Sequence, residues 1–136
     1  MSRILAIDLG LRRVGLAATD DEGIVALPLG VLTEERKTSD RLRRIERLGR
    51  ERRVDCFVVG LPPEGDGADQ ARDFATRLRA RTGKRTVLID EHLTSAEAED
   101  LIREAGRQPT RGTVDPIAAL VILRAFLDGA RHFEVA

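Results

Sequence analysis

The sequence has a single cysteine, four phenylalanines and no tyrosine or tryptophan, and Lys37 and Lys84 are its only lysines. One cysteine excludes an intrachain disulfide, and the apolar run around Cys56 (residues 54–59) favours a buried, unreactive thiol. No apolar stretch approaches the roughly 20 residues that a membrane helix needs. A zinc motif and a serine–histidine pairing are also missing. We therefore expect a protein of the reducing cytoplasm with no membrane contact.

The sequence also has no excess of charge of either sign, because 23 lysine and arginine residues balance 23 aspartate and glutamate residues. Net charge therefore gives no sign of nucleic-acid binding, and only a local patch would. The largest basic patch spans residues 36–53, with nine cations against three anions. It would suit a nucleic-acid backbone, but a solvated helix face is the more common explanation, and no aromatic residue is interleaved for base stacking.

Length and apolar content favour a single domain over residues 1–136. A chain of 136 residues with 42% apolar composition is long enough for one core and short for two. Three β-like runs near its start are separated by turn-forming residues and predict three antiparallel strands. These runs cover residues 4–8, 14–19 and 24–32.

A helix between two strands is predicted further along the chain. The pattern predicts an amphipathic helix over 38–53, a strand over 54–60, a helix over 67–82 ended by Gly83, and a strand over 86–90. A helix between two buried strands forms a βαβ unit, in which the strands run parallel through a right-handed crossover. The predicted fold is therefore an α/β fold with a five-stranded mixed sheet, three antiparallel strands then two parallel strands, flanked by helices.

Two further helices are expected before the end of the sequence. Thr94-Ser95-Ala96-Glu97 matches a capping box, in which the threonine and glutamate side chains satisfy N–H groups at a helix start. Asp115-Pro116 opens the last helix, since proline suits the first helical position. Residues 117–123 are apolar on all sides, which predicts that this helix packs onto the sheet.

Three carboxylates stand at the ends of these predicted elements. Asp8 ends the first strand, Glu91 follows a later strand, and Asp115 precedes the last helix. Strand ends of α/β sheets are common ligand sites, so the three side chains are expected to converge on one edge. Taken singly, Asp115 is an ordinary helix N-cap. Asp90 competes with Glu91, because adjacent strand residues point to opposite faces.

Converging carboxylates bind hard cations such as Mg²⁺ and Mn²⁺, which prefer oxygen ligands. In phosphodiester hydrolysis, two such ions about 3.5 to 4 Å apart activate the attacking water and stabilise the leaving oxygen, and Asp8 is best placed to bridge them. Arg12 and Arg13 follow Asp8 in a turn where they would clamp phosphate oxygens. A solvated basic turn is an equal alternative for these two arginines.

Five motifs occur in a recognisable order between residues 3 and 128. They are Ala6-Ile7-Asp8-Leu9-Gly10, Arg12-Arg13-Val14-Gly15-Leu16-Ala17, Val59-Gly60-Leu61-Pro62, Asp90-Glu91-His92-Leu93-Thr94-Ser95 and Val114-Asp115-Pro116-Ile117-Ala118-Ala119. Together they resemble the YqgF family, also called RuvX. Five motifs in one order are far more specific than any single one of them.

The resemblance implies an RNase H-like fold and a cytoplasmic bacterial nuclease whose acidic, metal-binding site falls on Asp8, Glu91 and Asp115. The family is associated with maturation of precursor 16S ribosomal RNA and with cleavage of four-way DNA (Holliday) junctions, which are different substrates. The family usually has arginine where this chain has His92, so phosphate contact would weaken or cleavage would become pH-sensitive. The sequence leaves open the substrate, the preferred metal and whether two copies form a homodimer.

Two other functions are compatible with this first strand and its acidic residue. An actin-like ATP-binding protein also has an acidic residue and glycines there, but it closes two domains around the nucleotide, and this chain has room for one. A non-catalytic nucleic-acid-binding module would not need three carboxylates. The sequence therefore favours a metal-dependent endonuclease acting on structured nucleic acid, with ribosomal RNA maturation ahead of junction resolution.

Overall fold

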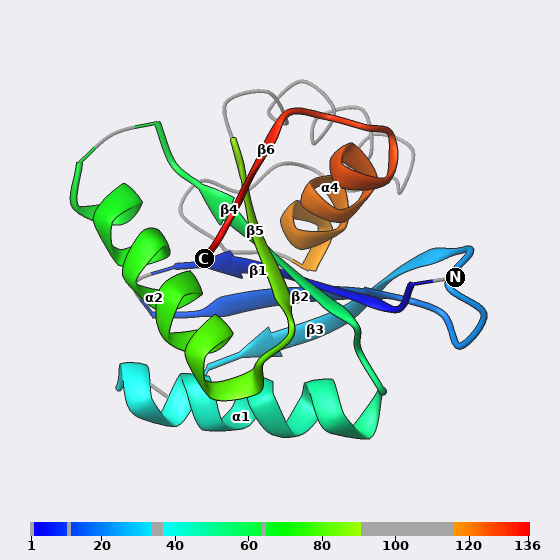
Figure 1. The fold of residues 1–136 in the computed structure, drawn as a ribbon, viewed down its shortest axis with the longest axis horizontal. Helices are drawn as coiled ribbons and strands as arrows, with labels where there is room; N and C mark the ends of the chain where they lie inside the picture. Colours follow the sequence, from blue (N-terminus) through cyan, green and yellow to red (C-terminus); the bar gives the residue numbers. More distant parts are fainter. Residues whose placement is uncertain (1, 11, 34–36, 64, 91–115) are drawn as a thin grey trace.

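The strands of the protein form one mixed sheet with helices on both faces (Figure 1). The computed structural model describes residues 2–10, 12–33, 37–63, 65–90 and 116–136. The six strands of this sheet follow the order β3-β2-β1-β4-β5-β6. Its elements are β1 (Ile4–Leu9), β2 (Val14–Thr19), β3 (Ala26–Leu32), α1 (Thr38–Glu51), β4 (Cys56–Leu61), α2 (Asp66–Thr82), β5 (Arg85–Asp90), α4 (Pro116–Leu127) and β6 (His132–Glu134).

The pairing of the first five strands confirms the predicted mixed sheet. β1 pairs antiparallel with β2, and β2 pairs antiparallel with β3. β4 runs parallel to both β1 and β5, and α2 connects β4 to β5, as expected of a βαβ unit. β1 therefore lies inside the sheet, with an antiparallel neighbour on one side and a parallel neighbour on the other.

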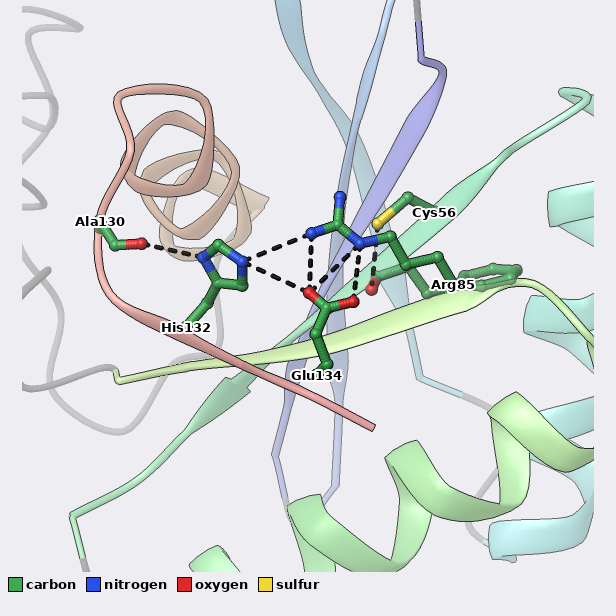
Figure 2. A network of polar contacts seen from close by, with 6 residues as sticks. Cys56, Arg85, Ala130, His132 and Glu134 are labelled. Atoms are coloured by element: carbon green, nitrogen blue, oxygen red, sulfur yellow. Dashed lines mark hydrogen bonds and ion pairs between the residues drawn. The ribbon is translucent and has the colours of Figure 1, made fainter. Parts of the chain in front are cut away.

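The predicted number of five strands is wrong, because β6 adds a sixth strand antiparallel to β5. A strand of three residues is too short to give a clear alternating pattern. Backbone pairing with β5 holds this strand, and an exposed ion pair adds to the contact: the Arg85 Nε donates to Glu134 Oε1 over 2.8 Å and its Nη2 to Oε2 over 2.7 Å (Figure 2). His132 Nε2 also lies 3.4 Å from Glu134 Oε2, and its Nδ1 lies 3.1 Å from the Ala130 carbonyl.

The third strand begins at Ala26, two residues later than the sequence predicts. The carboxylate of Asp20 explains the difference, because its Oδ1 accepts hydrogen bonds from the N–H groups of Ile24, at 2.8 Å, and Val25, at 3.2 Å. These bonds lower the pKa of Asp20 and hold the hairpin turn in a compact form. Ile24 and Val25 consequently stay exposed instead of joining the ladder.

Alternate residues of β1 point into two different cores. Leu5 and Ile7 belong to a buried cluster that includes side chains of α1 and α2. Ile4 and Ala6 belong to a second cluster, which includes side chains of α4. The sheet thus has an α1/α2 face and an α4 face, and Figure 1 shows these helices on opposite sides of it. The alternation of the strand assigns each position of β1 to one of the two faces.

The ends of two helices agree with the sequence signals. α2 ends at Gly83, whose φ of 67° is the left-handed conformation that favours glycine at a helix C-terminus. α4 begins at Pro116, as predicted from the preference of proline for the first helical position. The helix predicted from the capping box at residues 94–97 lies outside the described residues.

Cys56 is buried in β4, as the sequence predicts. Its burial raises the pKa of the thiol to about 11, so the thiol stays protonated near neutral pH. In the described part of the chain, no helix has both the length and the apolar character needed to cross a membrane.

Gly49 of α1 lies against the buried ring of Phe57 in β4, and a Cβ added to it would lie 2.7 Å from Phe57 Cζ. We expect Gly49→Ala to lower the free energy of unfolding by about 2 kcal/mol, because overpacking a core outweighs the better helix propensity of alanine. Urea denaturation measures the change. Gly67→Ala in α2 is the matched control, since its Cβ would meet Pro62 Cγ at 3.5 Å, an ordinary contact. Equal stability of the two variants would contradict the prediction.

Candidate metal centre

Asp8 lies near the carboxyl end of β1, where its backbone pairs with Gly15 of β2. Ile4 and Ala6 face the α4 core, so the alternation of the strand directs Asp8 to the same face. Its side chain is partly buried, in contrast to the fully buried residues before it. The structure therefore has a carboxylate at the point where an interior strand leaves the core, as the sequence predicts.

The turn that follows Asp8 carries the two predicted phosphate-binding arginines. A hydrogen bond of 2.9 Å from the Gly10 N–H to the Arg13 carbonyl closes the turn. Arg12 and Arg13 are exposed on it. Neither forms an ion pair with another residue of the described chain. Both side chains are therefore exposed on the turn that follows Asp8.

Arg41 of α1 holds the same turn, although the sequence did not single it out among the cations of residues 36–53. Its side chain is only 6% exposed, and its Nη1 donates a 2.8 Å hydrogen bond to the Gly10 carbonyl. A signal was available, because Arg41 lies one helical turn before Ile45 on the buried side of α1. A buried guanidinium bound to a carbonyl fixes the turn relative to the helix.

The other two predicted carboxylates adjoin described elements, one after the end of β5 and one before the start of α4. β5 ends at Asp90, immediately before Glu91, and its residues Val87 and Ile89 lie in the α4 core. Leu88 lies in the α1/α2 core, so Asp90 falls on the α1/α2 side of the strand by alternation. α4 begins one residue after Asp115 and packs on the face to which Asp8 is directed.

The rest of the predicted metal site lies outside the described residues. Glu91, His92, Thr94 and Asp115 all belong to residues 91–115. Within the part of the chain that the structure does describe, no three histidine, cysteine, aspartate or glutamate side chains are grouped closely enough to hold a metal ion. Of the three predicted ligands, Asp8 is thus the one whose position is described.

Comparison with protein families gives a match over nearly the whole chain. The model of a family described as "RuvX: Holliday junction resolvase" matches residues 2–129. A protein of Anaeromyxobacter sp. named "Putative pre-16S rRNA nuclease" is 44% identical, over 96% of this chain and 98% of its own. A protein of the same name from Synechococcus sp. is 39% identical, over 94% of this chain and 90% of its own.

Solved structures of low sequence identity share the fold. RuvC of T. thermophilus in complex with a Holliday junction substrate superposes with a TM-score of 0.64 at 13% identity, and the match covers 98% of this chain and 100% of that one. A second structure of Thermus thermophilus RuvC gives a TM-score of 0.59 at 16% identity over 96% and 99% of the two chains. This likeness, together with the mixed sheet, confirms the predicted RNase H-like fold.

Proposed function

Because the chain belongs to the RuvX family, we propose that it is a metal-dependent endonuclease that hydrolyses phosphodiester bonds in structured nucleic acid, with precursor 16S ribosomal RNA as its substrate. The observation that carries this proposal is the position of Asp8 at the carboxyl end of an interior strand, in a chain that matches its nuclease-named relatives along their length. Such an enzyme would work in the cytoplasm, with residues 1–136 acting as one domain.

The donor chemistry of the proposed site fits Mg²⁺ or Mn²⁺, since the oxygens of Asp8 are the hard ligands that both ions prefer. Asp8, Glu91 and Asp115 would hold the ions. When bound, the ions supply a water nucleophile and stabilise the leaving oxygen. A carboxylate at residue 115 would also benefit from the N-terminus of α4, which begins at the next residue and favours the charged form.

The alternation of β5 favours Glu91 over Asp90 as the second ligand. Val87 and Ile89 lie in the α4 core, to which Asp8 is also directed. If the alternation continues by one residue, position 91 follows them on that face, and Asp90 follows Leu88 on the other. The residue pattern left the choice between Asp90 and Glu91 open, and the family resemblance pointed to Glu91. The side of β5 that α4 covers gives a physical reason to prefer Glu91.

Arg12 and Arg13 would bind the scissile phosphate or the phosphate next to it. Both are exposed on the turn after Asp8, and a planar guanidinium binds two phosphate oxygens at once. Arg41 would act through the turn itself, because its hydrogen bond to the Gly10 carbonyl fixes the backbone between Asp8 and these arginines. Arg41 is thus a positioning residue in this proposal.

Resolution of four-way DNA junctions is the second candidate function. The description of the matching family and the fold shared with a junction-bound RuvC favour it. Symmetric cleavage of a junction needs two active sites related by a two-fold axis, so this candidate also requires a homodimer. Sedimentation of the protein with and without a junction would measure whether such a dimer forms.

A substrate panel tests the proposal directly. The purified protein is incubated with Mg²⁺, Mn²⁺ or a chelator, and with precursor 16S ribosomal RNA, single strands, duplexes and a four-way DNA junction. We expect metal-dependent cleavage of the precursor that leaves 5′-phosphate and 3′-hydroxyl ends. Cleavage that persists in the chelator would exclude the metal mechanism. Cleavage of the junction with intact RNA would support the second candidate, and no cleavage of any substrate would reject both.

A further inference from the structure

The two edges of the sheet differ in how well they are protected against pairing with a further strand. β6 is three residues long and carries His132 and Glu134, and a short, charged strand is a poor template for pairing. β3 is seven residues long, and none of its residues is charged. Its one neighbour among the described strands is β2. Of the two edges, β3 is therefore the one that suits the addition of a strand.

The second half of β3 is the part that a new strand would approach. Pro28 has no N–H group and blunts the first half of the edge. Gly30 has a φ of 142°, and a Cβ added to it would meet no atom within 4 Å. Glycine inside a strand often marks a site where another backbone comes close. Residues 29–32 thus form an edge without proline and, at Gly30, without a covering side chain.

A groove of about 380 Å³ lies beside this edge, between β3 and α1 (Figure 1). It is on the α1/α2 face of the sheet, because Leu29, Leu32 and Leu48 of its lining pack against the α1/α2 core. A strand added to β3 would direct every second side chain to this face. Those side chains would consequently meet an aliphatic floor.

The charged lining of the groove is mainly positive, since three arginines stand against one glutamate. These residues are Arg44, Arg47, Glu51 and Arg52. Arg44 and Arg47 are exposed and form no ion pair with another described residue. An acidic side chain that enters the groove would therefore gain a cationic partner without displacing an anion of the described chain.

A protein segment fits these features better than two other occupants do. The bases of a nucleic-acid strand stack on aromatic rings, and the described lining of the groove contains none. A second copy that paired through its own β3 would bring the arginines of both α1 helices together, and these like charges would repel. The groove also lies on the face opposite the one to which Asp8 is directed, so a bound segment would leave the proposed metal centre open.

We propose that β3 and the adjoining groove bind an extended, acidic segment of a partner protein, which adds a strand to the sheet. Backbone hydrogen bonds to residues 29–32 hold the segment, and its apolar side chains rest on the aliphatic floor. Pairing with Arg44 and Arg47 selects acidic segments over basic ones. This interaction goes beyond the proposed nuclease function and does not depend on it.

The probe is a fluorescent peptide of about eight residues, an ordinary strand length, that repeats leucine, threonine, glutamate and threonine. As a strand it places leucine and glutamate on one face and threonine on the other. Fluorescence anisotropy with the full chain measures its affinity. Arg44→Glu with Arg47→Glu is expected to weaken binding roughly tenfold or more at low salt, since an exposed ion pair contributes a factor of up to about five and reversal replaces attraction by repulsion. A probe with lysine for glutamate should bind this variant better than it binds the parent protein.

The matched control is Arg72→Glu with Arg77→Glu, which makes the same change at exposed positions of α2, where the arginines lie 3.7 Å from Asp69 and Asp73. This control should change the affinity by less than about twofold, because distant exposed charges are screened by salt. Circular dichroism confirms that both variants are folded. Equal weakening in both would reduce the effect to net charge and overturn the proposal. Failure of the parent protein to bind the acidic probe would overturn it as well.

Hydrogen exchange distinguishes the addition of a strand from binding to charge alone. The bound probe should slow amide exchange in residues 29–32, because N–H groups on the open edge gain partners. Slower exchange confined to α1 would show that the peptide lies on the arginines without extending the sheet, and the proposal would fail. A single-stranded RNA that bound more tightly than the probe and lost affinity in the groove variant would assign the groove to nucleic acid instead. A dimer that the probe dissociates in sedimentation would assign the edge to a second copy.

Discussion

Asp8→Asn is expected to lower the rate of nucleic-acid cleavage about a thousandfold at saturating metal. The Asp8 carboxylate would help to hold metal ions that supply several kcal/mol of transition-state stabilisation, and each 1.4 kcal/mol is a factor of ten in rate. Asparagine has the same shape but no charge, so the pairing of residue 8 with Gly15 should persist. Single-turnover cleavage of precursor ribosomal RNA measures the rate, and Mn²⁺ titration measures the loss of metal binding.

A control for this variant needs a carboxylate whose role is only structural. Asp20 provides one, because its Oδ1 accepts bonds from the N–H groups of Ile24 and Val25 in the hairpin between β2 and β3. Asp20→Asn should cleave at nearly the parent rate, since an amide oxygen can accept the same bonds. Parent-like cleavage by Asp8→Asn, with its fold intact by circular dichroism, would show that Asp8 is not a metal ligand.

Most of the sheet was predictable from the sequence because its signals are local. The run at residues 14–19 coincides with β2, and turn residues on both sides define its ends. Gly83 adopts the left-handed conformation expected at the end of α2. The parallel pairing of β4 and β5 followed from the helix between them and the usual hand of the crossover. These elements depend on neighbours within a few residues.

Features that depend on distant contacts were not predicted. β6 pairs with β5, and Arg85 and Glu134, which are 49 residues apart in the sequence, form an ion pair across the two strands. Arg41 is buried because it reaches the carbonyl of Gly10, 31 residues earlier. A charged residue on a basic helix normally indicates a solvated position, and only the packing of α1 beneath the turn reverses this expectation. Sequence periodicity predicts the helix, but it does not predict the distant residue that a side chain of the helix contacts.

The candidate site was partly predictable for a similar reason. Asp8 could be chosen because a strand end followed by glycine marks a point where the chain leaves the core. The residue pattern by itself could not decide between Asp90 and Glu91, and only the family resemblance pointed to Glu91, since the choice depends on which face of β5 is covered by α4. The core residues Val87 and Ile89 now identify that face. We therefore predict that substitutions of these two adjacent carboxylates differ greatly in their effect on the cleavage rate.

Glu91→Gln is expected to lower cleavage by two to three orders of magnitude, or about 3 to 4 kcal/mol, whereas Asp90→Asn should change it by less than about threefold. The reason is the alternation of β5: Asp90 follows Leu88 on the α1/α2 side, and residue 91 would follow Ile89 on the side shared with Asp8. The two variants remove the same charge one residue apart, so each controls for the other. Cleavage rates and Mn²⁺ affinity, measured side by side, give the comparison.

The result discriminates between three arrangements of the site. A large loss confined to Glu91→Gln supports a metal centre on the α4 side of the sheet. A large loss confined to Asp90→Asn would mean that the metal centre lies on the α1/α2 side of the sheet, to which the strand alternation directs Asp90. Equal losses would indicate that net negative charge at this end of the sheet, and not a specific ligand, controls cleavage. Since Asp8 follows Ala6 on the α4 side, the first outcome is the one that the packing of β1 and β5 favours.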